Sequence, residues 1–338
     1  MSAPRLSGRQ TTPMLDDKSW NILTSMEKLT ALTMGDELAN IARTRPDVVA
    51  VTADLASNNG LDVFREAFPD RFIDTGIAEQ NMMSVAAGLA SAGFIPYVAT
   101  FAAFASLLCA EQLRTDVAYT KMKVRVLSHH AGIATGFYGT SHHAVEDIAV
   151  TRAIGNLTVT AAADGNAIRG LIRATLDIDG PAYIRIGRGA EKTVYPEVPT
   201  FEYGRFVRHR EGSDLTVIGC GITVKSALDA ADILAAEGIS IRVLDAVYLK
   251  PLDEAAILAA ARETGGILTA EEHNPNGGLG SAVGELLALN GVPTRFAKLA
   301  LPDDYVLVAP PTHLYRHYGL SGDGVAKAVR ALLDRKGS

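Results

Sequence analysis

The stretch from Asp74 to Phe104 reads DTGIAEQNMMSVAAGLASAGFIPYVATFAAF, and it decides how the rest of the chain is interpreted. The run from Ala78 to Ala92 is rich in Ala, Met and Leu, which predicts a helix, and its small side chains suit close packing on a sheet. Glu79 falls in the first turn of this helix. A carboxylate there can complement the helix dipole, cap free backbone N–H groups, or serve a function, so its surroundings must decide between these explanations.

The composition describes a soluble globular protein with a large core. The chain has 338 residues, of which 48% are hydrophobic and 21% charged, enough for two ordinary domains. A formal charge of −6 without a strongly basic run argues against a nucleic-acid partner. The two cysteines, Cys109 and Cys220, are far apart in apolar contexts, which excludes a disulfide framework and favours a reducing cytoplasm.

The N-terminal segment does not have the pattern expected of a secretory signal. Residues 1–22 are mostly polar and lack the basic start and apolar core of a secretory signal, so we expect a polar N-terminal arm. Apolar runs of about 18 or more residues are absent, so we expect no membrane span.

Short apolar runs alternate with helical patterns along the chain. This alternation predicts an α/β fold of two doubly wound domains, each with a mostly parallel sheet covered by helices on both faces. Periodicity fades after Gly189 and restarts near Leu215. The expected organisation is a first domain over 23–190, a linker over 191–210 and a smaller domain over 211–338.

Polar residues follow two of the predicted strands. The loop that begins at Asp54 follows the strand at 47–52, and ligands collect at such strand ends in open α/β sheets. A second loop carries four histidines, His129, His130, His142 and His143. Adjacent residues of an extended chain point to opposite faces, which disfavours a metal site. Binding of a polar substrate is the functional interpretation, and simple bracing of a glycine-rich loop is the structural one.

Two glycine-rich stretches carry weaker signals. Residues 277–280 resemble an anion-binding loop but do not match the dinucleotide fingerprint. Residues 322–324 read Gly-Asp-Gly, yet too few residues follow for a diphosphate and magnesium loop, so we expect a turn that leads into the last helix.

Several ordered motifs together resemble the transketolase family. They are Asp54-Leu55-Ala56, DTGIAEQNMMSVAAGLA from Asp74, TFAAFAS from Thr100, HAGI from His130, YGTSHHAVEDIAVTRAI from Tyr138, GPAYIRIGRG from Gly180 and EEHNPNGGLGSAV from Glu271. The resemblance runs from about Met26 to the C-terminus, but it covers only the pyrimidine-binding and C-terminal domains of a transketolase. It therefore implies the C-terminal subunit of a split transketolase, whose partner subunit holds the diphosphate and Mg²⁺ of thiamine diphosphate.

The resemblance assigns cofactor contacts to four residues. The Glu at the position of Glu79 hydrogen-bonds N1′ of the aminopyrimidine and promotes its imino form, so Glu79 is the expected catalytic acid. Phe101 and Phe104 match positions that pack on the pyrimidine ring, although both could also be plain core residues. Asp54 matches an acid close to the cofactor.

The implied reaction transfers a two-carbon ketol unit from a ketose to an aldose acceptor. His142 aligns with the histidine that meets the donor hydroxyls, so it is the second catalytic candidate. His130 and Arg188 align with groups that bind the acceptor phosphate, for which a guanidinium fork is well suited. His143 is expected in the same substrate site.

Three departures from the family pattern point to an unusual substrate. Tyr138 stands where an acid normally contacts a substrate hydroxyl, Ala31 replaces an Arg, and Asn58 replaces a phosphate-binding Ser. Phosphate recognition is thinned and the pocket mouth is more aromatic. We therefore expect a branched, sulfonated or unphosphorylated sugar as the substrate.

The family also implies an assembly, in which a dimer of this chain is flanked by two partner subunits in an α2β2 complex. Two enzyme alternatives remain at this point, a 1-deoxyxylulose-5-phosphate synthase type and the β subunit of a 2-oxoacid dehydrogenase. A scaffolding paralogue without activity is the non-enzymatic alternative, and the retained Glu79 argues against it.

Overall fold

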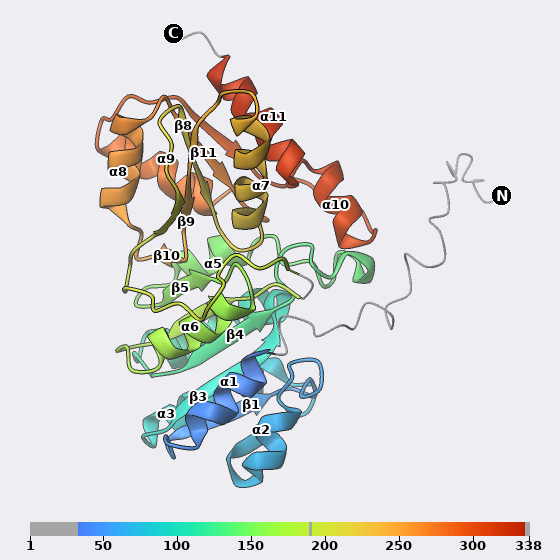
Figure 1. Cartoon of the computed structure of the whole chain (residues 1–338). Helices are drawn as coiled ribbons and strands as arrows, with labels where there is room; N and C mark the ends of the chain where they lie inside the picture. Colours follow the sequence, from blue (N-terminus) through green and yellow to red (C-terminus); the bar gives the residue numbers. More distant parts are fainter. Residues whose placement is uncertain (1–32, 189–190, 335–338) are drawn as a thin grey trace, which may run out of the picture.

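The computed structural model describes residues 33–188 and 191–334, and Figure 1 shows them as two stacked α/β units. This confirms the predicted fold class. The expected N-terminal arm and Ala31 lie outside the described residues.

The first domain is built on a seven-stranded sheet in the order β10-β5-β6-β4-β3-β1-β2. Its strands are β1 (Val48–Thr52), β2 (Phe72–Asp74), β3 (Ile95–Phe101), β4 (Arg125–His129), β5 (Thr158–Ala161), β6 (Ala182–Arg185) and β10 (Tyr248–Lys250). All neighbours pair in parallel except β10, which is antiparallel to β5. Every residue of β3 is buried, as expected for an apolar strand inside a parallel sheet with both faces covered.

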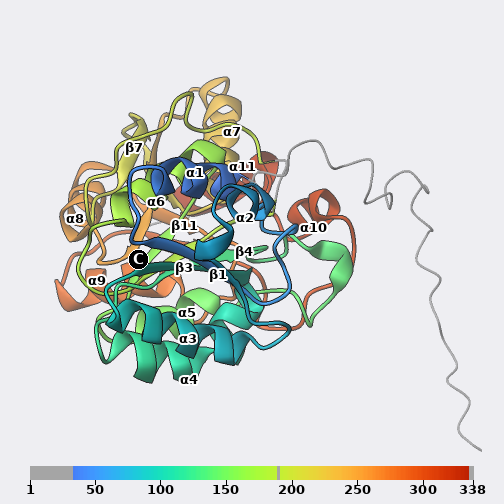
Figure 2. The same cartoon turned by 90° about the horizontal axis from the view of Figure 1, so that it is seen from below.

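Helices cover both faces of this sheet (Figure 2). One face carries α1 (Thr33–Ala42), α2 (Asp62–Ala67) and α6 (Gly165–Thr175). The other face carries α3 (Glu79–Ser91), α4 (Ala110–Gln112) and α5 (Asp147–Ala153), with the π-helical segments η4 (Phe104–Leu108) and η5 (Leu113–Ala118) on either side of α4. Two short 3₁₀ turns are η3 (Pro69–Arg71) and η6 (Gly136–Tyr138). None of the helices in the described ranges is long and apolar enough to cross a membrane.

The second domain has a five-stranded sheet in the order β12-β11-β8-β9-β7. Its strands are β7 (Val207–Arg210), β8 (Leu215–Gly219), β9 (Ile241–Asp245), β11 (Ile267–Ala270) and β12 (Phe296–Leu299). In Figure 1, α7 (Thr223–Ala235) and α11 (Gly322–Leu333) lie on one side of the sheet, while α8 (Glu254–Glu263) and α9 (Leu279–Leu289) lie on the other.

Strand β7 differs from the expectation for the linker. Residues 207–210 belong to the range assigned to the linker, yet they pair antiparallel with β9. Their sequence, VRHR, contains no apolar run because β7 is a partly exposed edge strand, and such a strand gives little signal.

The two domains are joined by shared structure. Strand β10 comes from the second half of the chain and completes the edge of the first sheet. A single apolar core runs across the junction and includes Tyr183, Ile218 and Leu249. A smaller apolar cluster joins Ile133 to Leu314 of α10 (Pro311–His317), so the C-terminal domain supports the loop that follows β4.

Candidate functional site

Four adjacent strands bring residues of the candidate site to one edge of the first sheet. Phe101 and His129 are the last residues of β3 and β4 and are direct partners in the register. Asp54 comes shortly after β1, and Arg188 shortly after β6. Because carboxyl ends of parallel strands meet at the same edge, residues far apart in sequence are gathered here.

Glu79 is the first residue of α3, and it is only 8% exposed. Ala78 precedes the helix and makes no side-chain cap. In the described part of the chain, the Glu79 carboxylate has no hydrogen bond or ion pair, so neither capping nor pairing accounts for it. Burial and the negative charge of Glu79 raise the pKa of the nearby Cys109 thiol to about 12. The site therefore contains a buried acid whose oxygens are available as acceptors.

Phe101 is the centre of an aromatic cluster. Its ring centroid lies 5.7 Å from that of Phe104, 4.5 Å from His130 and 5.6 Å from His142. Tyr138 extends the cluster, with its ring centroid 5.2 Å from that of His142, and its side chain is 43% exposed. The structure thus brings together five of the predicted site residues at the end of β3.

His130 links His129 to Arg188. Its φ of 61° turns the chain, so the ring Nδ1 atoms of His129 and His130 contact each other. The expectation that adjacent histidines point to opposite faces is wrong for this pair, because it assumed an extended chain. Arg188 Nε donates to His130 Nε2 at 3.2 Å. Since a guanidinium only donates, His130 Nε2 must accept and its Nδ1 carries the proton, which it donates to His129.

Burial keeps both imidazoles of this pair neutral. It lowers the pKa of His129 to about 3, and it lowers the pKa of His130 still further, together with the charges of its neighbours. His129 then carries its proton on Nε2, which is buried and has no hydrogen-bond partner among residues 33–188 and 191–334. Both ring nitrogens of His130 are engaged, so the donors that could meet a ligand beside His130, among the described residues, are the guanidinium N–H groups of Arg188.

The remaining predicted residues have different surroundings. His143 is buried and its Nε2 pairs with the Gly136 carbonyl at 3.2 Å, which braces the loop. Burial lowers the pKa of His143. Asp54 and Asn58 are exposed in the loop after β1, and in the described ranges neither side chain hydrogen-bonds to the aromatic cluster. Asp54 adopts a φ of 57° and its N–H donates to Asp74 Oδ1 at 2.9 Å.

Three further residues belong to this site and were not among the predicted ones. His129 lies edge-on to Phe101, with centroids 4.9 Å apart. The Phe137 ring supports the Arg188 guanidinium, 5.0 Å from its centroid. Asp74 also accepts the Gly76 N–H at 3.0 Å and so fixes the turn before Glu79. The signal for His129 was present, because it ends an apolar strand beside a glycine-rich loop.

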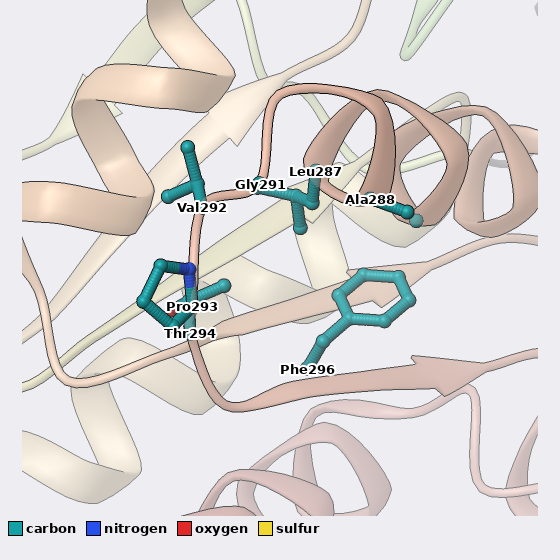
Figure 3. Close-up of a pocket in the computed structure, with 8 residues that line it drawn as sticks. Leu287, Ala288, Gly291, Val292, Pro293, Thr294 and Phe296 are labelled. Carbon is teal, nitrogen blue, oxygen red and sulfur yellow. The ribbon is translucent and has the colours of Figure 1, made fainter.

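A groove opens beside the aromatic cluster. Its volume is about 540 Å³. Its lining comes from η4, from the loop between β4 and α5 (residues 130–146, the histidine loop) and from the C-terminal domain. It includes Phe104, Leu107, Leu108, Ser141, His143 and Tyr305. A second pocket of about 300 Å³ lies between α9 and β12, where Figure 3 shows the Phe296 ring facing the helix end. The residues that line this second pocket carry no ionisable side chain. Of these two cavities, the groove beside the aromatic cluster is therefore the one that could bind and convert a polar substrate.

The glycine-rich loop at 277–280 binds a carboxylate of the same chain. Glu271 is fully buried and accepts the N–H groups of Leu279 and Gly280 at 2.7 and 2.8 Å. A carboxylate of this chain thus occupies the start of α9, where an external anion would bind.

Comparisons with known proteins agree with this architecture. The family described as the transketolase pyrimidine binding domain matches residues 27–192, and the transketolase C-terminal domain matches residues 204–325. A solved structure described as a split gene transketolase, an inactive β4 tetramer, has a TM-score of 0.82 and 39% identity, and the match covers 90% of this chain and 98% of that one.

Curated relatives include subunits of similar length. One of the subunits of apulose-4-phosphate transketolase from Phocaeicola vulgatus is 38% identical, with 87% of this chain and 94% of the relative covered. A subunit of 6-deoxy-6-sulfo-D-fructose transketolase from Clostridium sp. is 36% identical, with coverages of 90% and 94%. A 1-deoxy-D-xylulose-5-phosphate synthase from Heliobacterium modesticaldum is 38% identical, but the match covers 88% of this chain and only 46% of that enzyme. The chain therefore belongs to the transketolase family and resembles the C-terminal subunit of a split transketolase.

Proposed function

We propose that this chain is the pyrimidine-side subunit of a thiamine-diphosphate-dependent transketolase that transfers a two-carbon ketol unit from a ketose to an aldose. The observation that carries the proposal is Glu79, a buried carboxylate without a partner in the described residues, at the N-terminal end of α3. A scaffold has no need of such an acid, whereas a synthase-type enzyme would use it equally, so the identity of the donor must separate those two functions.

The residues present fit an aminopyrimidine. Phe101 and Phe104 offer aromatic surfaces to a flat, weakly polar ring. An unpaired buried carboxylate suits a heterocycle nitrogen that carries a proton, because burying the charge alone is costly. When bound, thiamine diphosphate would supply the electron sink that the carbon transfer needs.

Each side chain then has a defined task in the proposal. Glu79 holds a proton at N1′ of the pyrimidine, and the two phenylalanines orient the ring and keep water from it. His142 donates to the hydroxyl groups of the donor sugar. Arg188, held by His130 and by the Phe137 ring, binds an anionic group of the acceptor.

We assign the diphosphate and Mg²⁺ to a partner subunit. Apolar side chains are exposed around the site and support docking of another chain there, since Ile77 is 82% exposed, Leu107 51% and Tyr305 77%. We further propose an α2β2 assembly in the cytoplasm, and the two buried free thiols are compatible with a reducing compartment. His143 and Asn58 have supporting places in this proposal, the first bracing the loop and the second at the rim.

Tyr138 makes the mouth of the site aromatic. Its exposed ring contacts the ring of His142. Family members usually carry a carboxylate at the position of Tyr138. A phenol replaces the hydroxyl contact of that carboxylate with an aromatic surface, which can contact an apolar or branched carbon frame. We propose a branched, sulfonated or unphosphorylated sugar as the substrate.

The test is reconstitution with the partner subunit, thiamine diphosphate and Mg²⁺. We expect the isolated chain to be inactive and the complex to transfer ketol units. In the complex, Glu79→Gln should lower kcat by about 10²- to 10⁴-fold, because it removes the proton acceptor but keeps the shape. Glu111→Gln is the matched control, since Glu111 is exposed and pairs with Arg114. Full activity of the isolated chain would refute the split arrangement, and a Glu79→Gln loss below about tenfold would refute the role of Glu79.

The synthase-type alternative uses a different donor. Relatives of that type match this chain at about the same identity, so the donor must be tested directly. If the reconstituted complex forms a 1-deoxy sugar from a donor other than a ketose, the proposed ketol transfer is wrong and the synthase reaction is the function.

A further inference from the structure

The C-terminal domain inserts one carboxylate into the base of the histidine loop. Glu272 lies in the loop after β11, which ends at Ala270, and it is only 1% exposed. Its Oε1 atom accepts the Ile133 N–H at 2.8 Å and the Tyr315 hydroxyl at 2.8 Å. One partner belongs to the histidine loop and the other to α10, so this oxygen joins the two domains.

The two halves of the histidine loop cross where Glu272 binds. Gly132 and Ala144 exchange two backbone hydrogen bonds of 2.9 Å, which form an isolated antiparallel bridge. His130 lies two residues before Gly132, and His142 lies two residues before Ala144. The bridge therefore fixes, relative to each other, the two segments that carry these histidines, whose ring centroids lie 4.5 and 5.6 Å from that of Phe101.

Glu272 and Arg185 hold the bridge from its two sides. A Cβ atom at Gly132 would lie 2.1 Å from the Glu272 carboxyl carbon, so the carboxylate packs directly against the backbone there. Arg185 Nη2 donates to the Ala144 carbonyl at 3.3 Å and to the Glu272 carbonyl at 2.8 Å. Its Nε donates to Asp147 Oδ2 at 2.8 Å, which keeps the guanidinium in place.

A buried charge is a costly way to hold two domains together. Neutral or apolar side chains of similar size often serve stability as well or better. A carboxylate does offer a directed acceptor for one chosen N–H, and functional groups need such support to keep their geometry. This favours a role for Glu272 in placing the loop over a role in stability.

We propose that Glu272 is a positioning residue for the substrate site, which fixes the spacing of His130 and His142 from the C-terminal domain. The inference rests on the proposed ketol transfer. It also gives the C-terminal domain a direct part in substrate binding.

The experiment compares Glu272→Gln with Glu271→Gln in the reconstituted complex. Glu271 is the matched control because it is equally buried but caps α9, away from the loop. We expect Glu272→Gln to raise the KM of the acceptor about tenfold with kcat within about threefold, and Glu271→Gln to leave that KM unchanged. Tyr315→Phe, which removes only the hydroxyl that restrains the carboxylate, should raise KM in the same direction by less.

A second readout does not depend on activity. In the isolated chain, Glu272→Gln should accelerate amide hydrogen exchange across residues 130–146 about tenfold, without a similar change elsewhere. An unchanged exchange rate and an unchanged KM would overturn the proposal. A wild-type complex without ketol transfer would instead refute the proposed function, and the exchange result would still decide the positioning role.

Discussion

Glu272 should make the stability of this chain depend on pH in an unusual direction. Burial raises the pKa of the carboxyl to about 7 from 4.5, although Arg185 and the hydrogen bonds from Tyr315 and Ile133 oppose the rise. The negative charge of Glu191 adds to the rise. The folded chain therefore keeps this proton to a higher pH than the unfolded chain, so the contribution to stability is complete below about pH 4.5 and is lost as the pH rises through about 7.

The magnitude follows from the two pKa values. Between about pH 5 and about pH 8, the Glu272 contribution to the free energy of unfolding should fall by roughly 2 to 3 kcal/mol. Glutamine has no proton to lose, so Glu272→Gln should gain stability over the wild type by that amount across the range. His129 and His130 act in the opposite sense, because burial lowers the pKa of each, but they are common to both proteins and cancel in the difference.

Urea denaturation of both proteins at several pH values measures this difference. We expect the free energy of unfolding of Glu272→Gln minus that of the wild type to increase with pH, with most of the increase between about pH 5 and about pH 7. A flat difference, or one that favours the wild type at alkaline pH, would refute the reasoning. A variant that is more stable yet binds its acceptor less well would separate stability from positioning, as expected for a functional residue.

Three other outcomes follow from the structure. Tyr138→Asp should shift the preference of the reconstituted enzyme toward ordinary phosphosugars by about tenfold in kcat/KM, measured by competition between acceptors, and an unchanged profile would contradict our interpretation of the loop. Gly132→Ala should cost about 3 kcal/mol in denaturation experiments, because a Cβ there meets the Glu272 carboxylate at a positive φ, whereas Gly93→Ala, with a positive φ and open space, should cost about 1 kcal/mol. Both cysteines are buried with a raised thiol pKa, so a thiol reagent should react with the native chain roughly a thousandfold more slowly than with the unfolded chain, and rapid native labelling would disprove their burial.

The sequence predicts the regular part of this fold well, for a physical reason. Runs such as Ile95–Phe101 and Leu215–Gly219 are mostly apolar because both faces of a parallel strand are buried. Strands β7 and β10 give no such signal, since each lies at a sheet edge and depends on a partner distant in sequence. The π-helical form of Phe104–Leu108 is also absent from the sequence pattern, which indicated only one apolar helix face.

Some features of the candidate site could likewise be predicted from the sequence, and others could not. That Phe101, His130 and Arg188 share one edge follows from the parallel arrangement of β3, β4 and β6, and a mostly parallel sheet was predicted from the alternation of strand and helix patterns. The contact between His129 and His130 could not be predicted, because it depends on the left-handed backbone of His130. Glu272 was hidden for another reason, since it lies in the other domain and meets the loop only through tertiary packing.

The first sheet is complete only after strand β10, which lies late in the chain, has been synthesised. Until Tyr248–Lys250 pairs with β5, the edge of the first sheet offers unpaired N–H and C=O groups to any other strand. Lys250 then also closes the end of α5, where its Nζ donates to the carbonyls of Arg152 and Ile154. A fragment that ends between the two sheets would thus have an unpaired sheet edge and would tend to aggregate. Fusion or truncation boundaries in this protein should therefore fall outside both domains.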